Sequence, residues 1–180
     1  SLSRGDKRIA LYPSPHFKVT YSISFDHPLL RHQSRTLRLT EESFIDEMAI
    51  AGGHDPLDFR IGLTRDVPRW QTALTTLKAK SGYTTDLPRG EGMGIGIHEN
   101  HGTIVAHAAT VTVSRRGQLR VEQVVSVFDP GHAVNPLTCV EQIESGIAFE
   151  LSHTIRGGME IRNGQIASNN FDTFQITRIS

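Results

Sequence analysis

The spacing of apolar residues divides the chain into an extended start, a helical middle and a strand-rich second half. Apolar and polar residues alternate through residues 9–25, with prolines between them, so residues 1–40 are expected to be extended or loop. Residues 41–80 carry apolar residues three and four positions apart, which predicts helices. Residues 93–180 are expected to form hairpins together with one long helix.

Three helices are predicted in the middle of the chain. The first begins near Glu41, with acidic residues in its first turn, and ends at residues 52–53, which are both glycine. The second has Asp55 as N-cap and Pro56 as its first residue. The third covers residues 67–80 and has one apolar side, formed by Trp70, Leu74 and Leu77.

The second half predicts an antiparallel sheet and one long helix. β-Branched residues on both sides of the turn at residues 115–117 indicate a β-hairpin. Asn135-Pro136 opens a helix that ends at residues 157–158, and Asn163-Gly164 marks a last hairpin. The helix is expected to bury one face, formed by Val140, Ile143, Ile147, Leu151 and Ile155. The fold class is therefore α+β, with an antiparallel sheet and segregated helices.

Charge and cysteine content exclude several classes of function. The 19 basic and 19 acidic residues balance, which argues against nucleic acid or a membrane surface as the main partner. No window reaches the roughly 18 apolar residues of a membrane span. The single cysteine, Cys139, excludes an internal disulfide and an iron–sulfur cluster built by this chain alone. Ser1 in place of an initiator Met favours an internal portion of a longer chain. The sequence does not indicate whether the protein is cytoplasmic or periplasmic.

The glycine-rich run at residues 90–96 suggests a phosphate loop only superficially. A phosphate loop lies between a strand and a helix, so that helix N–H groups meet the phosphate. Here more strand follows, and glycines alternate with period two. We therefore interpret the run as a strand with one face crowded by another backbone.

Three histidines, His98, His101 and His107, suggest a metal site. Zinc proteases require two histidines four positions apart on a helix, whereas His98 and His101 are three apart on strand and loop. Polar loop histidines are the preferred interpretation. A stand-alone metal hydrolase built on these residues remains an alternative, and it would require zinc.

Residues 129–136 combine a strand end, a tight turn and a helix start. Free backbone N–H groups at such a point could hold an anion, or the Asn-Pro pair could simply cap the helix. Gln142 in the following helix is solvent-facing by default, while Gly146 costs about 1 kcal/mol relative to alanine. A ligand or another helix packed closely on Gly146 would explain that glycine. Arg31 could be exposed or could bind a carboxylate or phosphate.

Several segments, in collinear order over nearly the whole chain, together resemble one family. The chain resembles the molybdenum-cofactor-binding large subunits of the xanthine dehydrogenase and aldehyde oxidase family, in the branch of isoquinoline 1-oxidoreductase. The matching segments are residues 43–49 (SFIDEMA), 53–60 (GHDPLDFR), 94–106, 128–146 and 168–172. Residues 1–180 would then be an internal portion of the molybdopterin-binding domain.

The resemblance implies a chemistry, a cofactor and partners. Enzymes of this family hydroxylate an aldehyde or an N-heterocycle, with water as the oxygen source and a glutamate as general base. They use a molybdenum-pterin cofactor, expected here in the cytosine dinucleotide form. The implied partners are a small-molecule substrate, the remainder of the same large subunit, and an iron–sulfur small subunit that removes electrons.

The resemblance also assigns residues. Gln142 resembles the glutamine that contacts the cofactor, and Arg31 stands where the family has an arginine beside it, although the glycine of that turn is missing here. Gly131 and Gly146 lie in the matching motifs and complete the expected cofactor-binding set. The catalytic glutamate and the first cofactor loop of the family lie outside this chain, so no catalytic or metal-binding residue is assigned. The isolated chain is expected to be inactive and free of metal. The alternative is a noncatalytic, truncated relative that acts as a scaffold or binding module.

Overall fold

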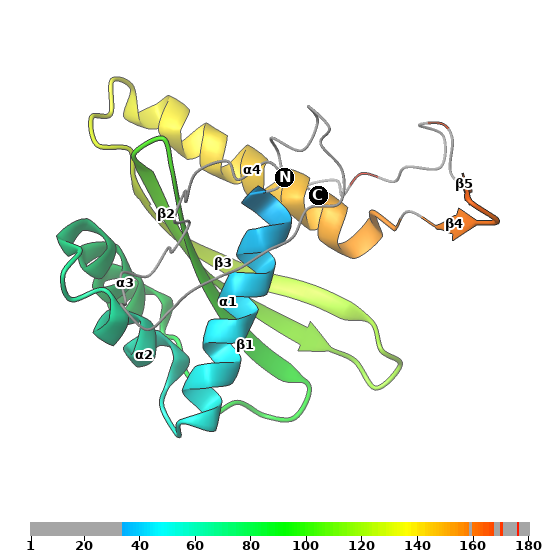
Figure 1. Cartoon of the computed structure of the whole chain (residues 1–180), viewed down its shortest axis with the longest axis horizontal. Helices are drawn as coiled ribbons and strands as arrows, with labels where there is room; N and C mark the ends of the chain where they lie inside the picture. The colour runs from blue at the N-terminus through cyan, green and yellow to red at the C-terminus, as the bar shows by residue number, and fades with distance from the viewer. Residues whose placement is uncertain (1–33, 159, 168–169, 171–175, 177–180) are drawn as a thin grey trace, which may run out of the picture. The chain divides into compact units, whose positions relative to one another are not determined.

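A computed structural model describes residues 34–158, 160–167, 170 and 176 of the chain. The chain divides into two compact units, residues 1–131 and 132–180, and each is described by itself. The described part of the first unit holds α1 (Ser34–Ala51), α2 (Pro56–Leu63), α3 (Pro68–Ser81), β1 (Glu91–Asn100), β2 (Thr103–Val113) and β3 (Leu119–Asp129) (Figure 1). The second unit holds α4 (Pro136–Arg156), β4 (Ile161–Arg162) and β5 (Gln165–Ile166).

Helix α1 starts at Ser34, well before the predicted start at Glu41. The expectation that residues 1–40 are extended or loop is therefore wrong for residues 34–40, and residues 1–33 lie outside the described residues. The polar residues of 34–40 include no glycine or proline, so nothing in them stops the helix from extending toward the N-terminus. Glu41 is consequently not a first-turn acid but a buried residue inside the helix.

The predicted start of α2 and the predicted apolar side of α3 are confirmed. Asp55 Oδ1 accepts hydrogen bonds from the backbone N–H groups of Leu57 and Asp58, at 2.9 and 3.0 Å, and Pro56 is the first helical residue. Helix α3 ends at Gly82, whose φ of 63° is left-handed. Its predicted apolar side, formed by Trp70, Leu74 and Leu77, is buried.

The sheet has the order β1-β2-β3, with both pairs antiparallel. The predicted turn at residues 115–117 joins β2 to β3. Another turn, formed by the two residues His101-Gly102, joins β1 to β2 and was missed by the sequence interpretation. Both of its residues have positive φ, 52° and 80°. Positive φ is uncommon for residues other than glycine, and His-Gly is not among the dipeptides that typically mark a hairpin, so the turn has little sequence signal.

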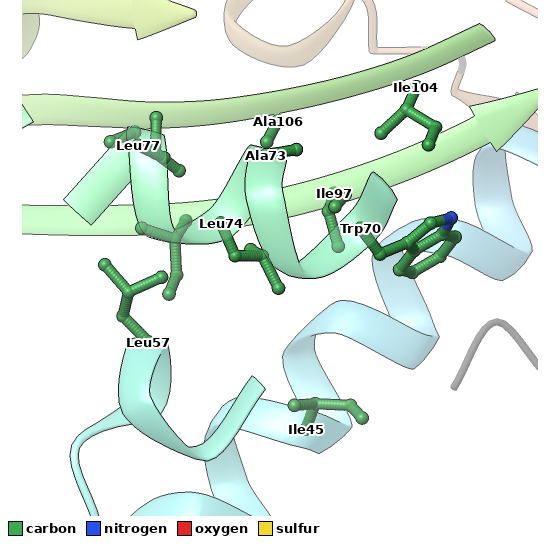
Figure 2. Packing of buried hydrophobic residues seen from close by; sticks show 11 residues of the cluster. Ile45, Leu57, Trp70, Ala73, Leu74, Leu77, Ile97, Ile104 and Ala106 are labelled. Carbon is green, nitrogen blue, oxygen red and sulfur yellow. The ribbon is translucent and has the colours of Figure 1, made fainter. Parts of the chain in front are cut away.

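The core lies between one face of this sheet and the helices of the first unit. Figure 2 shows side chains of α3 pointing toward those of β1 and β2, with Leu57 of α2 and Ile45 of α1 beside them. The buried apolar cluster comprises Ile45, Leu57, Trp70, Ala73, Leu74, Leu77, Ile95, Ile97, Ile104, Ala106 and Ala108. Alternate strand residues enter the cluster, as expected for a sheet with one covered face. The predicted α+β class is confirmed.

In the second unit, the predicted boundaries are confirmed but the predicted burial is not. Asn135 caps α4, Gly157 ends it, and the turn at residues 163–164 joins β4 to β5. The apolar stripe of α4 is only partly covered: Val140 is 53% exposed and Ile155 is 42% exposed. A 3.6-residue period identifies an apolar face without identifying what covers it, which is why the expectation of a buried face failed.

Candidate functional site

The turn Asp129-Pro130-Gly131, at the end of β3, is held by its own first side chain. Asp129 Oδ1 accepts a hydrogen bond from the Gly131 N–H at 2.8 Å. Gly131 has a φ of 76°, a conformation that favours glycine. Because its N–H is already engaged, Gly131 contributes turn geometry and a missing side chain rather than a free donor.

Arg69, in the first turn of α3, binds the same aspartate from the other side. Its Nε donates to Asp129 Oδ2 at 2.8 Å, and its Nη2 donates to the carbonyl oxygens of Gly102 at 3.0 Å and Asp129 at 3.4 Å. The guanidinium therefore ties the β1–β2 turn to the end of β3. The next residue, Trp70, donates its Nε1–H to Glu99 Oε2 at 2.5 Å, so α3 also contacts the end of β1.

Hydrogen bonding in this cluster favours the charged forms of both Arg69 and Asp129. The hydrogen bond from Arg69, followed by the one from the Gly131 N–H, lowers the pKa of Asp129 below its usual value. The same hydrogen bond to Asp129 raises the pKa of Arg69. The pair is therefore ionised at neutral pH.

The start of α4 leaves no first-turn donor for a ligand. Asn135 Oδ1 accepts from the N–H groups of Leu137 at 3.1 Å and Thr138 at 3.4 Å, and the Cys139 N–H donates to the Asn135 carbonyl at 3.2 Å. Pro136 has no N–H. The structure thus favours a simple cap over the anion site considered from the sequence.

Gln142 and Gly146 lie one turn apart on the same face of α4, and both are exposed. Gln142 makes no hydrogen bond to any described residue, so its amide is able to both donate and accept. A Cβ placed on Gly146 would meet nothing within 4 Å, so the close packing expected at this glycine is not present in the second unit. This face therefore offers a ligand the Gln142 amide and the open space beside Gly146.

The four residues assigned from the sequence are only partly brought together. Gln142 and Gly146 share one helix face in the second unit, while Gly131 ends the first unit. Arg31 lies outside the described residues. Their roles toward a cofactor stay predictions.

The glycine run at residues 90–96 enters β1, and no helix follows it, as the strand interpretation requires. The expected crowding by another backbone is present at Gly90, where a Cβ would meet the Val113 carbonyl oxygen at 3.0 Å, but not at the glycines inside the strand. A Cβ on Gly94 would meet nothing within 4 Å, and a Cβ on Gly96 would meet only the Glu42 side chain, at 3.9 Å.

His98 lies on β1, His101 in the adjoining turn and His107 on β2. Among the described residues, no three histidine, cysteine or acidic side chains come together in a way that could hold a metal ion. His107 Nδ1 is 2.8 Å from Ser126 Oγ across the β2–β3 pair, and burial lowers the pKa of its imidazole. No sequence pattern indicated this pair.

A buried arginine was also missed by the sequence interpretation. Arg60 of α2 is fully buried, and its Nε donates to Glu42 Oε2 at 3.0 Å while its Nη1 donates to Asp46 Oδ1 at 2.5 Å. It also donates to the carbonyl oxygens of Glu42 and Pro56. The available signal was the pair of acids four residues apart on α1, which face the same side of the helix. Arg60 holds α1 against α2 and is not placed to bind a ligand.

Comparison with known proteins identifies the family. A family model for the molybdopterin cofactor-binding domain matches residues 42–180, more than half of the chain. The chain belongs to this family, as the resemblance had predicted. It is also 25% identical, over 148 residues, to the beta subunit of isoquinoline 1-oxidoreductase from Brevundimonas diminuta, which covers 80% of this chain and 19% of that protein.

The N-terminal segment matches a different family. Residues 1–54 match the model for UDP-3-O-acyl N-acetylglycosamine deacetylase. The deacetylase of Citrifermentans bemidjiense is 40% identical over 47 residues, covering 26% of this chain and 15% of that enzyme. The deacetylase of Leptospira biflexa is 60% identical over 37 residues, covering 21% and 12%.

This second match corrects the extent of the resemblance. The resemblance to the molybdenum-cofactor-binding subunits was assigned to nearly the whole chain, whereas the match to the molybdopterin cofactor-binding domain begins at residue 42. Arg31 lies before that point and inside the deacetylase match. The two matches overlap at residues 42–54, which include the second half of α1.

The chain spans less than a fifth of the length of each of these curated relatives. No solved structure matches it. None of the described helices is long and apolar enough to cross a membrane.

Proposed function

We propose that this chain forms part of the large subunit of a molybdenum hydroxylase, which oxidises an aldehyde or an N-heterocycle with water as the oxygen source. The observation that carries the proposal is the molybdopterin cofactor-binding match over residues 42–180, supported by similarity to the isoquinoline 1-oxidoreductase beta subunit. In this proposal the remainder of the same large subunit completes the site, and an iron–sulfur small subunit receives the electrons.

The face of α4 that bears Gln142 and Gly146 fits a cofactor of this kind. Gln142 has an exposed amide with no hydrogen-bonding partner among the described residues, and Gly146 leaves open space one turn away. Gln142 would hold the polar edge of the cofactor by donating and accepting, and Gly146 would allow close approach to the helix. Gly131 and Arg31 complete the proposed set. When bound, the group, proposed in its cytosine dinucleotide form, supplies two-electron redox chemistry.

The described acids do not supply the general base in this proposal. Glu99, on β1, accepts the indole N–H of Trp70, and that hydrogen bond engages one of its carboxylate oxygens. Glu144, on α4, is exposed and lies outside the face that bears Gln142 and Gly146. The base is therefore proposed to come from the remainder of the subunit, and the isolated chain is proposed to be inactive.

The proposal is tested with the full large subunit co-expressed with its iron–sulfur partner. The assembly is supplied with an aldehyde or an N-heterocycle, a redox dye and isotope-labelled water. Dye reduction, with solvent oxygen in the product, is expected. A cofactor-loaded assembly that reduces no dye with either substrate class would contradict the proposed function.

One observation favours a second candidate, a noncatalytic scaffold or binding module. Arg31, one of the expected cofactor residues, belongs to a deacetylase-like segment that spans only about 15% of that enzyme's length. In this candidate, a chain that is similar to parts of two different enzymes carries out the chemistry of neither. An assembly that forms stably but contains no molybdenum would support this candidate.

A further inference from the structure

The first turn of α3 contacts the ends of β1 and β3 and the turn between β1 and β2. Trp70 binds Glu99 at the end of β1, and Arg69 binds the Gly102 carbonyl in the β1–β2 turn as well as Asp129 at the end of β3. Asp129 and Arg69 are 60 residues apart in the sequence. This cluster, Arg69 with Asp129 and the Gly102 carbonyl, is called the strand-end clamp below.

The strand-end clamp fixes the orientation of the Asp129 carboxylate. One oxygen, Oδ2, is held by Arg69, which leaves the other, Oδ1, directed to the Gly131 N–H. The guanidinium fork also binds the Asp129 carbonyl, so the side chain and the backbone of the aspartate are fixed by the same group. The left-handed conformation of Gly131 is therefore stabilised from α3, by a residue whose hydrogen bonds go to Asp129 and Gly102.

We propose that Arg69 is a positioning residue of the cofactor site, acting on Gly131 through Asp129. The inference rests on the proposed function, because Gly131 is one of the proposed cofactor residues. Without Arg69, Asp129 loses the partner that orients its carboxylate, and the turn samples other conformations. Lysine at position 69 would keep the charge but lose the fork that binds the carboxylate and the carbonyls together.

Two substitutions separate this role from a general loss of stability. Arg69→Met removes the clamp. Lys78→Met removes another exposed ion pair of the same helix, the one with Asp58 of α2, and serves as the matched control. Arg69→Lys tests whether charge alone is sufficient, and Asp129→Asn provides a second way to weaken the clamp if Arg69→Met does not fold.

The experiment measures hydrogen exchange at the Gly131 amide and molybdenum content, both in the full subunit assembled with its partner. In Arg69→Met we expect Gly131 exchange to be about tenfold faster, as for loss of a stabilising hydrogen bond in a local opening equilibrium. Molybdenum content should fall at least by about half, with Arg69→Lys intermediate and Lys78→Met unchanged.

The possible failures are distinguishable. A wild-type assembly without molybdenum would contradict the proposed function, whatever the exchange data show. A molybdenum-containing wild type with unchanged Gly131 exchange in both Arg69→Met and Asp129→Asn would overturn the positioning role. Equal loss of molybdenum in Arg69→Met and Lys78→Met would also overturn it, because the effect would then be one of stability.

Discussion

At the scale of single residues, the described part of the chain relies on a few polar groups that lie far apart in the sequence. Arg60 is fully buried, and acids of α1 accept its hydrogen bonds. Arg69 performs a comparable task near the surface, with Asp129 as its acid. Local sequence patterns do not predict such contacts, because the partners are separated by 14 to 60 residues.

Removing Arg60 is expected to destabilise the chain strongly. Arg60→Met leaves the carboxylates of Glu42 and Asp46 without the buried cation between them, and breaking a buried ion pair costs roughly 3 kcal/mol. Urea denaturation of the isolated chain measures the change in the free energy of unfolding. Arg65→Met, an exposed arginine five positions away, is the control and should change that free energy by less than about 0.5 kcal/mol.

The pH dependence of stability is expected to involve His107. Burial lowers the pKa of its imidazole below the ordinary value of 6.5, so between the two values the unfolded chain binds more protons than the folded chain. The contribution of His107 is therefore complete above pH 6.5 and is lost as the pH falls through the lowered pKa. His107→Gln should flatten the decrease of melting temperature on acidification. Identical pH profiles for the two proteins would exclude this role.

At the scale of elements, the sequence predicted what is local and missed what is not. The Asp55-Pro56 and Asn135-Pro136 helix starts and the Asn163-Gly164 turn were predicted, because each depends on neighbouring residues. The start of α1 was missed because its polar residues hold no stop signal. Similarly, the proposed site residues Gln142 and Gly146 came from resemblance, while the proposed role of Arg69 depends on tertiary contacts that no local motif encodes.

Gly146 gives a test in which stability and function move in opposite directions. Apart from its own stretch of helix, a Cβ placed there would meet nothing within 4 Å, so Gly146→Ala should stabilise the isolated chain by about 1 kcal/mol through helix propensity. In the assembled subunit the same change should lower molybdenum content, because the methyl group occupies the space proposed for the cofactor. Thermal unfolding and elemental analysis measure the two effects. Higher stability with full molybdenum content would remove Gly146 from the proposed site.

At the scale of the whole molecule, the chain combines two family matches that meet within α1. Residues 42–54 belong to both matches. In the structure, Ile45 and Ala49 of this overlap are buried, and Glu42 binds Arg60 of α2. The overlap is therefore an integral part of the α+β core, while the match to the deacetylases continues through residues 1–41.

The isolated chain is expected to bind no metal of its own. Its one cysteine cannot build a cluster, and the described residues include no converging set of three metal-binding side chains. Elemental analysis of the purified chain should find no stoichiometric molybdenum, iron or zinc. Stoichiometric zinc would instead revive the metal hydrolase considered for His98, His101 and His107.

The central claim, that this chain holds part of a molybdenum cofactor, is tested most directly by measuring molybdenum and pterin in the assembled large subunit before and after Gln142→Ala. Leaving a cofactor group unsatisfied by removing the Gln142 amide should cost roughly 1–3 kcal/mol of binding, so molybdenum and pterin should be lost together. Gln123→Ala, an exposed glutamine on β3, is the matched control and should retain both. Unchanged molybdenum and pterin in Gln142→Ala, with unchanged turnover, would contradict the account.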